Sequence, residues 1–272
     1  MKLLAVFLCN VLVCGRAFAL EPACALDDGF AIPSAGTMAV ASQCYPGAES
    51  YIRGVFAAGA WRVPYGIGDL TVTTVHAGFG SDRLGISLSA SGSGFELYGE
   101  EHEKLGCSFS PFPFISSGLR ITRSAMRIRG FGHASAWSAD AGVVVHPCES
   151  VFLAGSLEDI NGAEIGESRE PLDGSLRFAA SWRMPVDVTL LAAVTKVRRF
   201  DPSLSAGLTL ALARVLTLGV VGANEPDRFE FLCGVNIRGA IFSYRGLSHS
   251  DLDMTHGFSI VWYGENDTDI CM

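Results

Sequence analysis

The feature that most constrains this chain is an alternation of apolar residues with small or polar residues, which recurs from about residue 53 to residue 263. In the segment 83–90, Leu84, Ile86 and Leu88 alternate with glycine and serine, and segments 175–183 and 228–238 follow the same rule. Successive side chains of a β-strand point to opposite faces, so a period of two predicts strands. We identify fourteen candidate strands: 53–62, 68–79, 82–92, 103–110, 117–129, 132–146, 150–157, 174–183, 185–197, 203–213, 215–222, 227–237, 239–247 and 254–263.

Composition narrows the class of protein that such strands can build. The chain has a mean hydropathy of +0.32 and only 18% charged residues, yet no stretch after residue 20 reaches the 18 apolar residues of a membrane helix. Two classes remain, a soluble exported β-sandwich and an outer-membrane β-barrel. The polar face of the strands is rich in glycine, serine and threonine, which suits a lumen, while the apolar face suits lipid. We therefore expect an all-β, up-and-down antiparallel transmembrane barrel of 12–14 strands, with fourteen as the best count.

The lengths of the connections between candidate strands support the barrel. Connections at even positions in chain order are mostly tight, such as Gly80-Ser81, whereas longer ones fall at odd positions, such as 93–102, 158–173 and 248–253. The fourth connection, 111–117, is an exception because it is longer than a turn. Alternating short and long connections are typical of barrels that have both termini in the periplasm.

The N-terminal segment indicates export. Lys2, an apolar core from Leu3 to Cys14 and the small residues of Ala17-Phe18-Ala19 form a signal-peptide pattern. A lipoprotein signal ending at Cys14 fits less well, because Val13 is large for the position before a lipidated cysteine. We therefore divide the chain into a signal peptide (1–19), an N-terminal arm or hatch (20–52), a barrel (53–264) and a C-terminal tail (265–272), and expect it in the outer membrane.

The charge balance excludes one class of partner. The formal net charge is −8, which disfavours nucleic acid because phosphate contacts need clustered lysine and arginine. An arginine-rich stretch does occur at Arg120, Arg123, Arg127 and Arg129. These arginines form either a solvated face or, in a barrel, part of the lumen lining.

The sequence contains no motif that indicates an enzyme. The six histidines are scattered, with no paired spacing that would ligate a metal, and no glycine-rich phosphate loop follows a strand. The cluster of Glu100, Glu101 and Glu103 indicates an exposed acidic loop and not an acid/base pair. We therefore expect no catalytic residue, no bound metal and no cofactor.

Short motifs at both ends of the chain resemble a known family. Gly29-Phe30-Ala31-Ile32-Pro33, followed by Ser34-Ala35-Gly36, resembles the mature N-terminus of the FadL-type outer-membrane long-chain fatty-acid transporters. The proline of that family's Asn-Pro-Ala signature corresponds to Pro46. The stretches 159–162, 176–182 and 255–264 are similar to the related PorV/PorQ branch.

The resemblance implies a function. A hydrophobic ligand such as a long-chain fatty acid would enter near the outer rim, pass without an energy source and be released by movement of the hatch. It implies Phe30, Ile32 and Pro46 as residues of the hatch and ligand path, with outer-membrane lipid as the surroundings. The PorV-like branch implies instead an accessory barrel that scaffolds secretion-machinery proteins. A soluble exported β-sandwich is the third interpretation.

Cysteine positions raise a hypothesis within the same resemblance. Removing the signal peptide leaves six cysteines, whose pairing the sequence does not determine. If the arm is a hatch, a disulfide between Cys24 and Cys44 could hold its shape.

Overall fold

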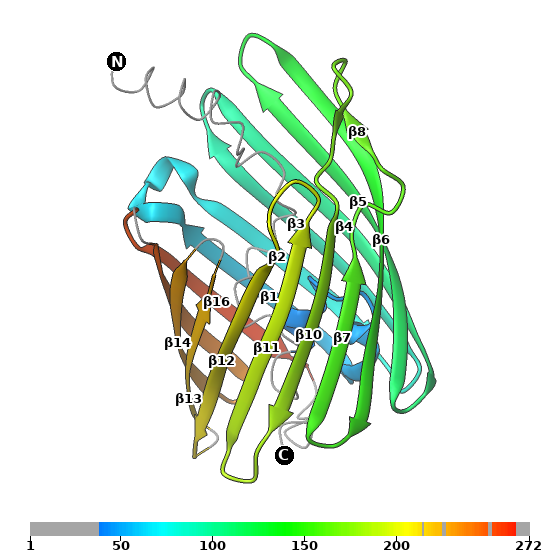
Figure 1. The fold of residues 1–272 in the computed structure, drawn as a ribbon, viewed down its shortest axis with the longest axis vertical. Helices are drawn as coiled ribbons and strands as arrows, with labels where there is room; N and C mark the ends of the chain where they lie inside the picture. The colour runs from blue at the N-terminus through cyan, green and yellow to red at the C-terminus, as the bar shows by residue number, and fades with distance from the viewer. Residues whose placement is uncertain (1–37, 214, 225–226, 250–251, 265–272) are drawn as a thin grey trace.

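The computed structural model describes residues 38–213, 215–224, 227–249 and 252–264 (Figure 1). Within them, fourteen strands form one closed antiparallel barrel in which neighbours in chain order pair and β16 returns to β1. The closing ladder pairs Phe56 with Tyr263 and Val63 with His256. The predicted up-and-down barrel is therefore confirmed.

The barrel strands match the fourteen predicted segments. Their bounds are β1 (Gly54–Val63), β2 (Val72–Gly80), β3 (Leu84–Phe95), β4 (Tyr98–Phe112), β5 (Ile115–Ile128), β6 (Gly132–Cys148), β7 (Val151–Leu157), β10 (Ser175–Arg183), β11 (Val188–Val197), β12 (Ser203–Leu212), β13 (Leu216–Ala223), β14 (Arg228–Ile237), β15 (Ala240–His249) and β16 (Thr255–Tyr263). A small hairpin, β8 (Glu164–Ile165) and β9 (Glu170–Pro171), lies in the connection between β7 and β10. Short helices are α2 (Met38–Ala41), η1 (Ala48–Tyr51), η2 (Pro64–Gly66) and η3 (Gly68–Leu70).

Two predicted loops are wrong. Most of the segment 93–102 is strand. β3 continues to Phe95 and β4 begins at Tyr98, so only residues 96 and 97 form a tight turn. The acidic residues that indicated a loop continue the alternation of β4, with Glu100 buried inside the barrel and Glu101 and Glu103 facing outward. The fourth connection is also tight, since β4 runs to Phe112 and β5 starts at Ile115. The fourth connection, which was the exception in the sequence, therefore fits the predicted alternation of short and long connections.

Strands β3 to β6 are longer than the rest of the barrel. They have 12, 15, 14 and 17 residues, whereas the neighbouring β7 has 7. In Figure 1 they project upward beyond the other strands, at the end that carries β8. We call this end, where the connection 158–174 lies, the outer end. The end with the turn between β2 and β3 is the inner end.

Apolar side chains cover the outside of the barrel. Along β3, Leu84, Ile86 and Leu88 are 57%, 57% and 62% exposed, while Ser87 and Ser89 on the other face are buried. An apolar surface that surrounds a closed barrel would be unfavourable in water and matches the hydrocarbon of a bilayer. In the described residues, no helix has the length and apolarity needed to cross a membrane.

Residues 38–52, which we call the arm, run inside the barrel. All of them are buried except Tyr51, which is partly buried. Apolar residues of the arm, including Met38, Val40 and Ile52, pack in one cluster with Phe56 of β1 and Val144 of β6. The predicted signal peptide, the first part of the predicted hatch (20–37) and the tail 265–272 lie outside the described residues, so the proposed division of the chain stays a prediction.

Candidate functional site: the barrel lumen

The lumen has two chemically different walls. Inward side chains of β2 to β6 are mostly hydroxyls and charged groups: Thr74, His76, Ser87, Ser89, Ser91, His102, Lys104, Ser108, Arg120, Thr122, Ser124, Ser138 and Asp140. The wall formed by the remaining strands is mixed. Its inward apolar residues are Phe56, Ala58, Ala60, Phe152, Ala154, Ala179, Leu191, Val221 and Val261, and its buried polar residues include Ser156, Ser175, Arg177, Ser181, Glu230 and Thr255. The lumen is therefore polar along β2 to β6 and has apolar surface mainly on the other side.

A row of glycines on the polar wall receives the arm. Gly80 pairs with Gly85, and Gly118 pairs with Gly142, in ladders that Ser108 of β4 connects. A Cβ atom on Gly142 would lie 2.3 Å from the carbonyl oxygen of Pro46, and one on Gly80 would lie 1.9 Å from a carbonyl oxygen of the arm. The arm backbone can approach the wall this closely only because these positions lack a side chain.

Polar contacts fix the arm along this row. The carboxylate of Glu49, which is fully buried, accepts the backbone N–H of Gly47 at 2.8 Å and the hydroxyl of Ser87 at 2.9 Å. Ser50 forms hydroxyl hydrogen bonds with Ser110 at 2.8 Å and Ser116 at 2.6 Å. A buried carboxylate that accepts two donors is stabilised against its loss of hydration, so these contacts hold the arm in one position.

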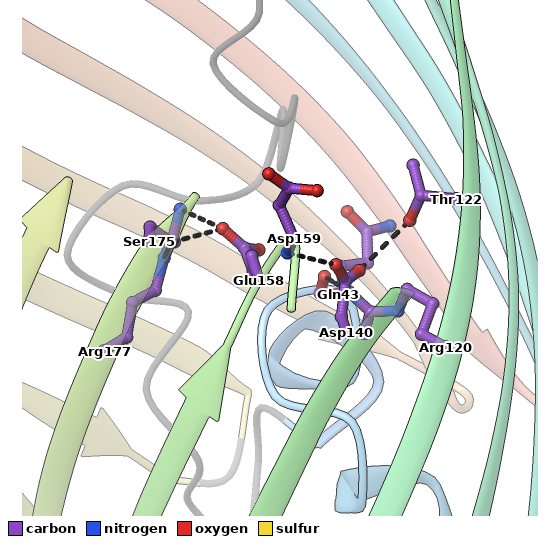
Figure 2. Close-up of polar contacts among 8 residues, drawn as sticks. All are labelled: Gln43, Arg120, Thr122, Asp140, Glu158, Asp159, Ser175 and Arg177. Carbon is purple, nitrogen blue, oxygen red and sulfur yellow. Dashed lines mark hydrogen bonds and ion pairs between the residues drawn. The ribbon is translucent and has the colours of Figure 1, made fainter. Parts of the chain in front are cut away.

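Arg120 on β5 binds a second part of the arm. Its guanidinium donates to the carbonyl oxygens of Ser42 and Gln43, directly after α2. Figure 2 shows Arg120 beside Gln43. The arginine stretch noted in the sequence is thus divided between two faces. Arg120 lies in the lumen, whereas Arg123 and Arg129 form outward ion pairs with Glu103 and Glu96.

A cluster of charged and hydroxyl groups lies where the outer connection 158–174 begins (Figure 2). Glu158 accepts a hydrogen bond from the Ser175 hydroxyl and forms an ion pair with Arg177 at 3.5 Å. Burial tends to raise the pKa of the Glu158 carboxyl, but Arg177 and the other nearby cations, with the Ser175 hydrogen bond, lower it below its usual value overall. Glu158 is therefore the charged partner of Arg177.

Beside this cluster, the polar wall presents groups that the described residues leave without a hydrogen-bond partner. They are the Thr74 hydroxyl, Nδ1 of His76 and Nε2 of His102, all on buried side chains. Lys104 is also buried, at 5% exposure, and belongs to the same ladder row as His76, with Ser89 between them. Thr74 and His102 lie in the neighbouring row, with Ser91 between them. Buried polar groups normally have partners, so these two rows indicate a place where a ligand binds.

The arrangement can bind a molecule with an apolar body and an accepting or anionic group. The ammonium of Lys104 and the imidazole of His102 offer donors, and the inward residues Phe56, Ala58 and Ala60 offer apolar contacts. The His76 ring donates through Nε2 to the Ser42 hydroxyl oxygen, whose own hydrogen goes to the Ala39 carbonyl, so its Nδ1 is an acceptor. Within the described ranges, no group of three or more His, Cys, Asp or Glu side chains is placed to hold a metal ion. Sequence analysis missed this site because 76, 102 and 104 are distant in sequence, although their parity on the polar faces of their strands is a usable signal.

Only some of the candidate site residues from the sequence analysis lie in the part of the chain that the structure describes. Pro46 is buried and lies against Gly142, and Cys44 is buried in the arm. Phe30, Ile32 and Cys24 lie outside the described residues. The roles of Phe30, Ile32 and Pro46 in a ligand path, and the Cys24–Cys44 disulfide, therefore stay predictions.

Comparison with solved structures identifies similar barrels. No family model and no curated protein sequence matches the chain. The CymD monoaromatic hydrocarbon channel aligns with a TM-score of 0.61 at 8% sequence identity, over 84% of this chain and 93% of that one. A FadL homologue from Pseudomonas aeruginosa aligns with a TM-score of 0.60 at 10% identity, over 84% and 94% of the two chains. This chain has a FadL-like fold.

A third similar structure is also a transport protein. The toluene transporter TodX from Pseudomonas putida aligns with a TM-score of 0.56 at 9% identity, over 80% of this chain and 90% of that one. At such low sequence identities the structural similarity defines the fold of this chain but does not identify its ligand. The PorV/PorQ branch of the sequence resemblance stays a prediction.

Proposed function

We propose that the chain is an outer-membrane barrel that binds a hydrophobic small molecule with an anionic or accepting group, such as a long-chain fatty acid, and lets it pass without an energy source. The observation that carries the proposal is the lumen itself, which is polar on β2 to β6, has most of its apolar side chains on the opposite strands, and holds the arm inside it. The apolar outer surface supports a membrane location. The FadL-like fold and the resemblance of the N-terminal motif support the same class of ligand.

In this proposal Lys104 binds the head group. Its side chain is buried on the polar wall in the same row as His76 and beside the row of His102, while Ala58 and Ala60 lie inward on β1. A carboxylate would accept from the Lys104 ammonium and from Nε2–H of His102, and an acyl chain would contact Ala58 and Ala60. The ligand then leaves when the arm is displaced from the glycine row.

Binding of a labelled long-chain fatty acid to the purified full chain in detergent tests the proposal. Saturable binding is expected, and Lys104→Gln should weaken it by about tenfold or more, since a charge-assisted hydrogen bond is worth about 1.5–3 kcal/mol. Lys196→Gln is the matched control, because Lys196 is exposed and donates to the Phe200 carbonyl.

Two outcomes would change the assignment. Equal loss of binding in both variants would remove Lys104 from the site, and saturable binding of toluene but of no fatty acid would point to a neutral hydrocarbon as ligand. No saturable binding of either, together with a stable complex of co-purified secretion proteins, would replace transport with the accessory-barrel function.

A further inference from the structure

Two oppositely charged side chains face each other in the ladder between β5 and β6. Arg120 and Asp140 are register partners, and both are buried, at 2% and 4% exposure. Opposite charges at directly paired positions of an antiparallel sheet attract each other. In the described structure, however, each is bound to different partners, which Figure 2 shows.

The arm holds Arg120. Both terminal nitrogens of its guanidinium donate to backbone carbonyls, those of Ser42 and Gln43. These two acceptors are neutral. The one charged group of the arm nearby, the Glu49 carboxylate, lies over Gly106, the register partner of Arg120, and is bound to the Gly47 N–H and the Ser87 hydroxyl. A carboxylate is a stronger acceptor for a buried guanidinium than two carbonyl oxygens are.

The outer connection holds Asp140. Its carboxylate accepts the Thr122 hydroxyl at 3.1 Å and the backbone N–H of Asp159 at 3.1 Å. Two residues further along the connection, the Asn161 side chain accepts the backbone N–H of Ala139 at 2.8 Å and donates to the Trp137 carbonyl at 3.0 Å. These hydrogen bonds to β6 hold Asp159 in place. The partner of Asp140 therefore depends on where the start of the connection 158–174 lies.

We propose that Arg120 and Asp140 are a latent ion pair that couples the outer connection to the arm. When the Asp159 N–H withdraws from Asp140, the carboxylate pairs with Arg120, and the guanidinium leaves the carbonyls of the arm. The arm thereby loses its hydrogen bonds to Arg120 in response to a movement at the start of the outer connection. Because coupling between two sites is reciprocal, displacement of the arm also loosens the start of the outer connection. The coupling goes beyond the proposed transport function and requires no particular ligand.

Hydrogen–deuterium exchange of the ligand-free full chain in detergent tests the coupling, read at the backbone amides of residues 42–45. Asn161→Ala releases the start of the outer connection and should speed exchange there by about tenfold, the scale expected for loss of a charge-assisted hydrogen bond. In an Asp140→Asn background, which removes the charge that attracts Arg120, the same substitution should leave exchange at 42–45 unchanged. An equal effect in both backgrounds, or no effect in either, would overturn the proposal.

A second variant perturbs the Arg120–Asp140 pair without changing the outer connection or the charge of Asp140. Thr122→Val removes one donor from the Asp140 carboxylate, so exchange at 42–45 should rise. Thr195→Val is the matched control, since Thr195 lies on the lumen side of β11 and pairs with neither Arg120 nor Asp140. Equal exchange in the two threonine variants would contradict the coupling even if Asp140→Asn fails to fold.

Discussion

Gly118 on β5 lies against Gly47 of the arm so closely that a Cβ atom on Gly118 would be 2.4 Å from the Gly47 nitrogen. Gly47 has a φ of 116°, a left-handed conformation that favours glycine, so neither residue can readily carry a side chain. The pair shows that the inner surface of the barrel and the arm are shaped to each other in the bound state.

This contact predicts the effect of Gly118→Ala. The added methyl group collides with the backbone of Pro46 and Gly47, and overpacking of this kind costs about 1–3 kcal/mol. We expect the arm to loosen, which limited proteolysis within residues 42–52 would detect. Gly222→Ala is the control, because a Cβ atom on Gly222 meets nothing within 4 Å. Equal protection of the arm in both variants would contradict the close contact.

Glu49 gives a second prediction about the arm. Glu49→Ala leaves the Gly47 N–H and the Ser87 hydroxyl without their acceptor, and such a loss at a buried site costs about 1–3 kcal/mol. The midpoint of urea unfolding in lipid vesicles should fall. Glu101→Ala, on the exposed outer face of β4, should leave it unchanged. A midpoint that falls equally in both variants would indicate a general effect of removing a carboxylate.

The Glu158–Arg177 pair predicts a dependence of stability on pH. The folded-state pKa of Glu158 lies below its ordinary 4.5, so the ionised carboxylate stabilises the fold. This contribution is fully present above pH 4.5 and is lost as the pH falls through the folded-state pKa. Glu158→Gln should therefore be less stable than the wild type at pH 7, and the difference should shrink below pH 4. The temperature at which the folded barrel converts to the unfolded band on gels measures it. A difference independent of pH would contradict this assignment.

The outer surface predicts where charge is tolerated. Leu105 is 55% exposed on the outer face of β4, and Leu105→Arg should cost about 2–4 kcal/mol in a bilayer if this position lies near the midplane. Phe131→Arg should be nearly neutral, because Phe131 is 89% exposed in the turn between β5 and β6, beyond the apolar band. Urea unfolding in lipid vesicles measures both. Equal tolerance of arginine at the two positions would mean that the barrel exterior does not face lipid.

Much of the fold follows from local sequence because alternation alone assigns side chains to faces. Leu84, Ile86 and Leu88 identify the outer face of β3 without knowledge of any other strand. The same rule failed between residues 93 and 102, where glycine and glutamate indicated a loop, although Glu100 simply continues the inward series of β4. Charged residues inside a barrel look like loop residues in sequence, since only the closed structure buries them.

The sequence by itself determined that this chain forms about fourteen strands with one apolar face each, because the period of two depends only on backbone geometry. Which inward residues meet was decided by the tertiary structure. Three features depend on register: the pairing of Arg120 with Asp140, the row of Gly80, Gly85, Gly118 and Gly142, and the placement of His76 and Lys104 in one row. A shift of one residue would reverse every face. The arm inside the lumen depends on closure of the barrel, which brings β1 to β16 and encloses the space that the arm occupies.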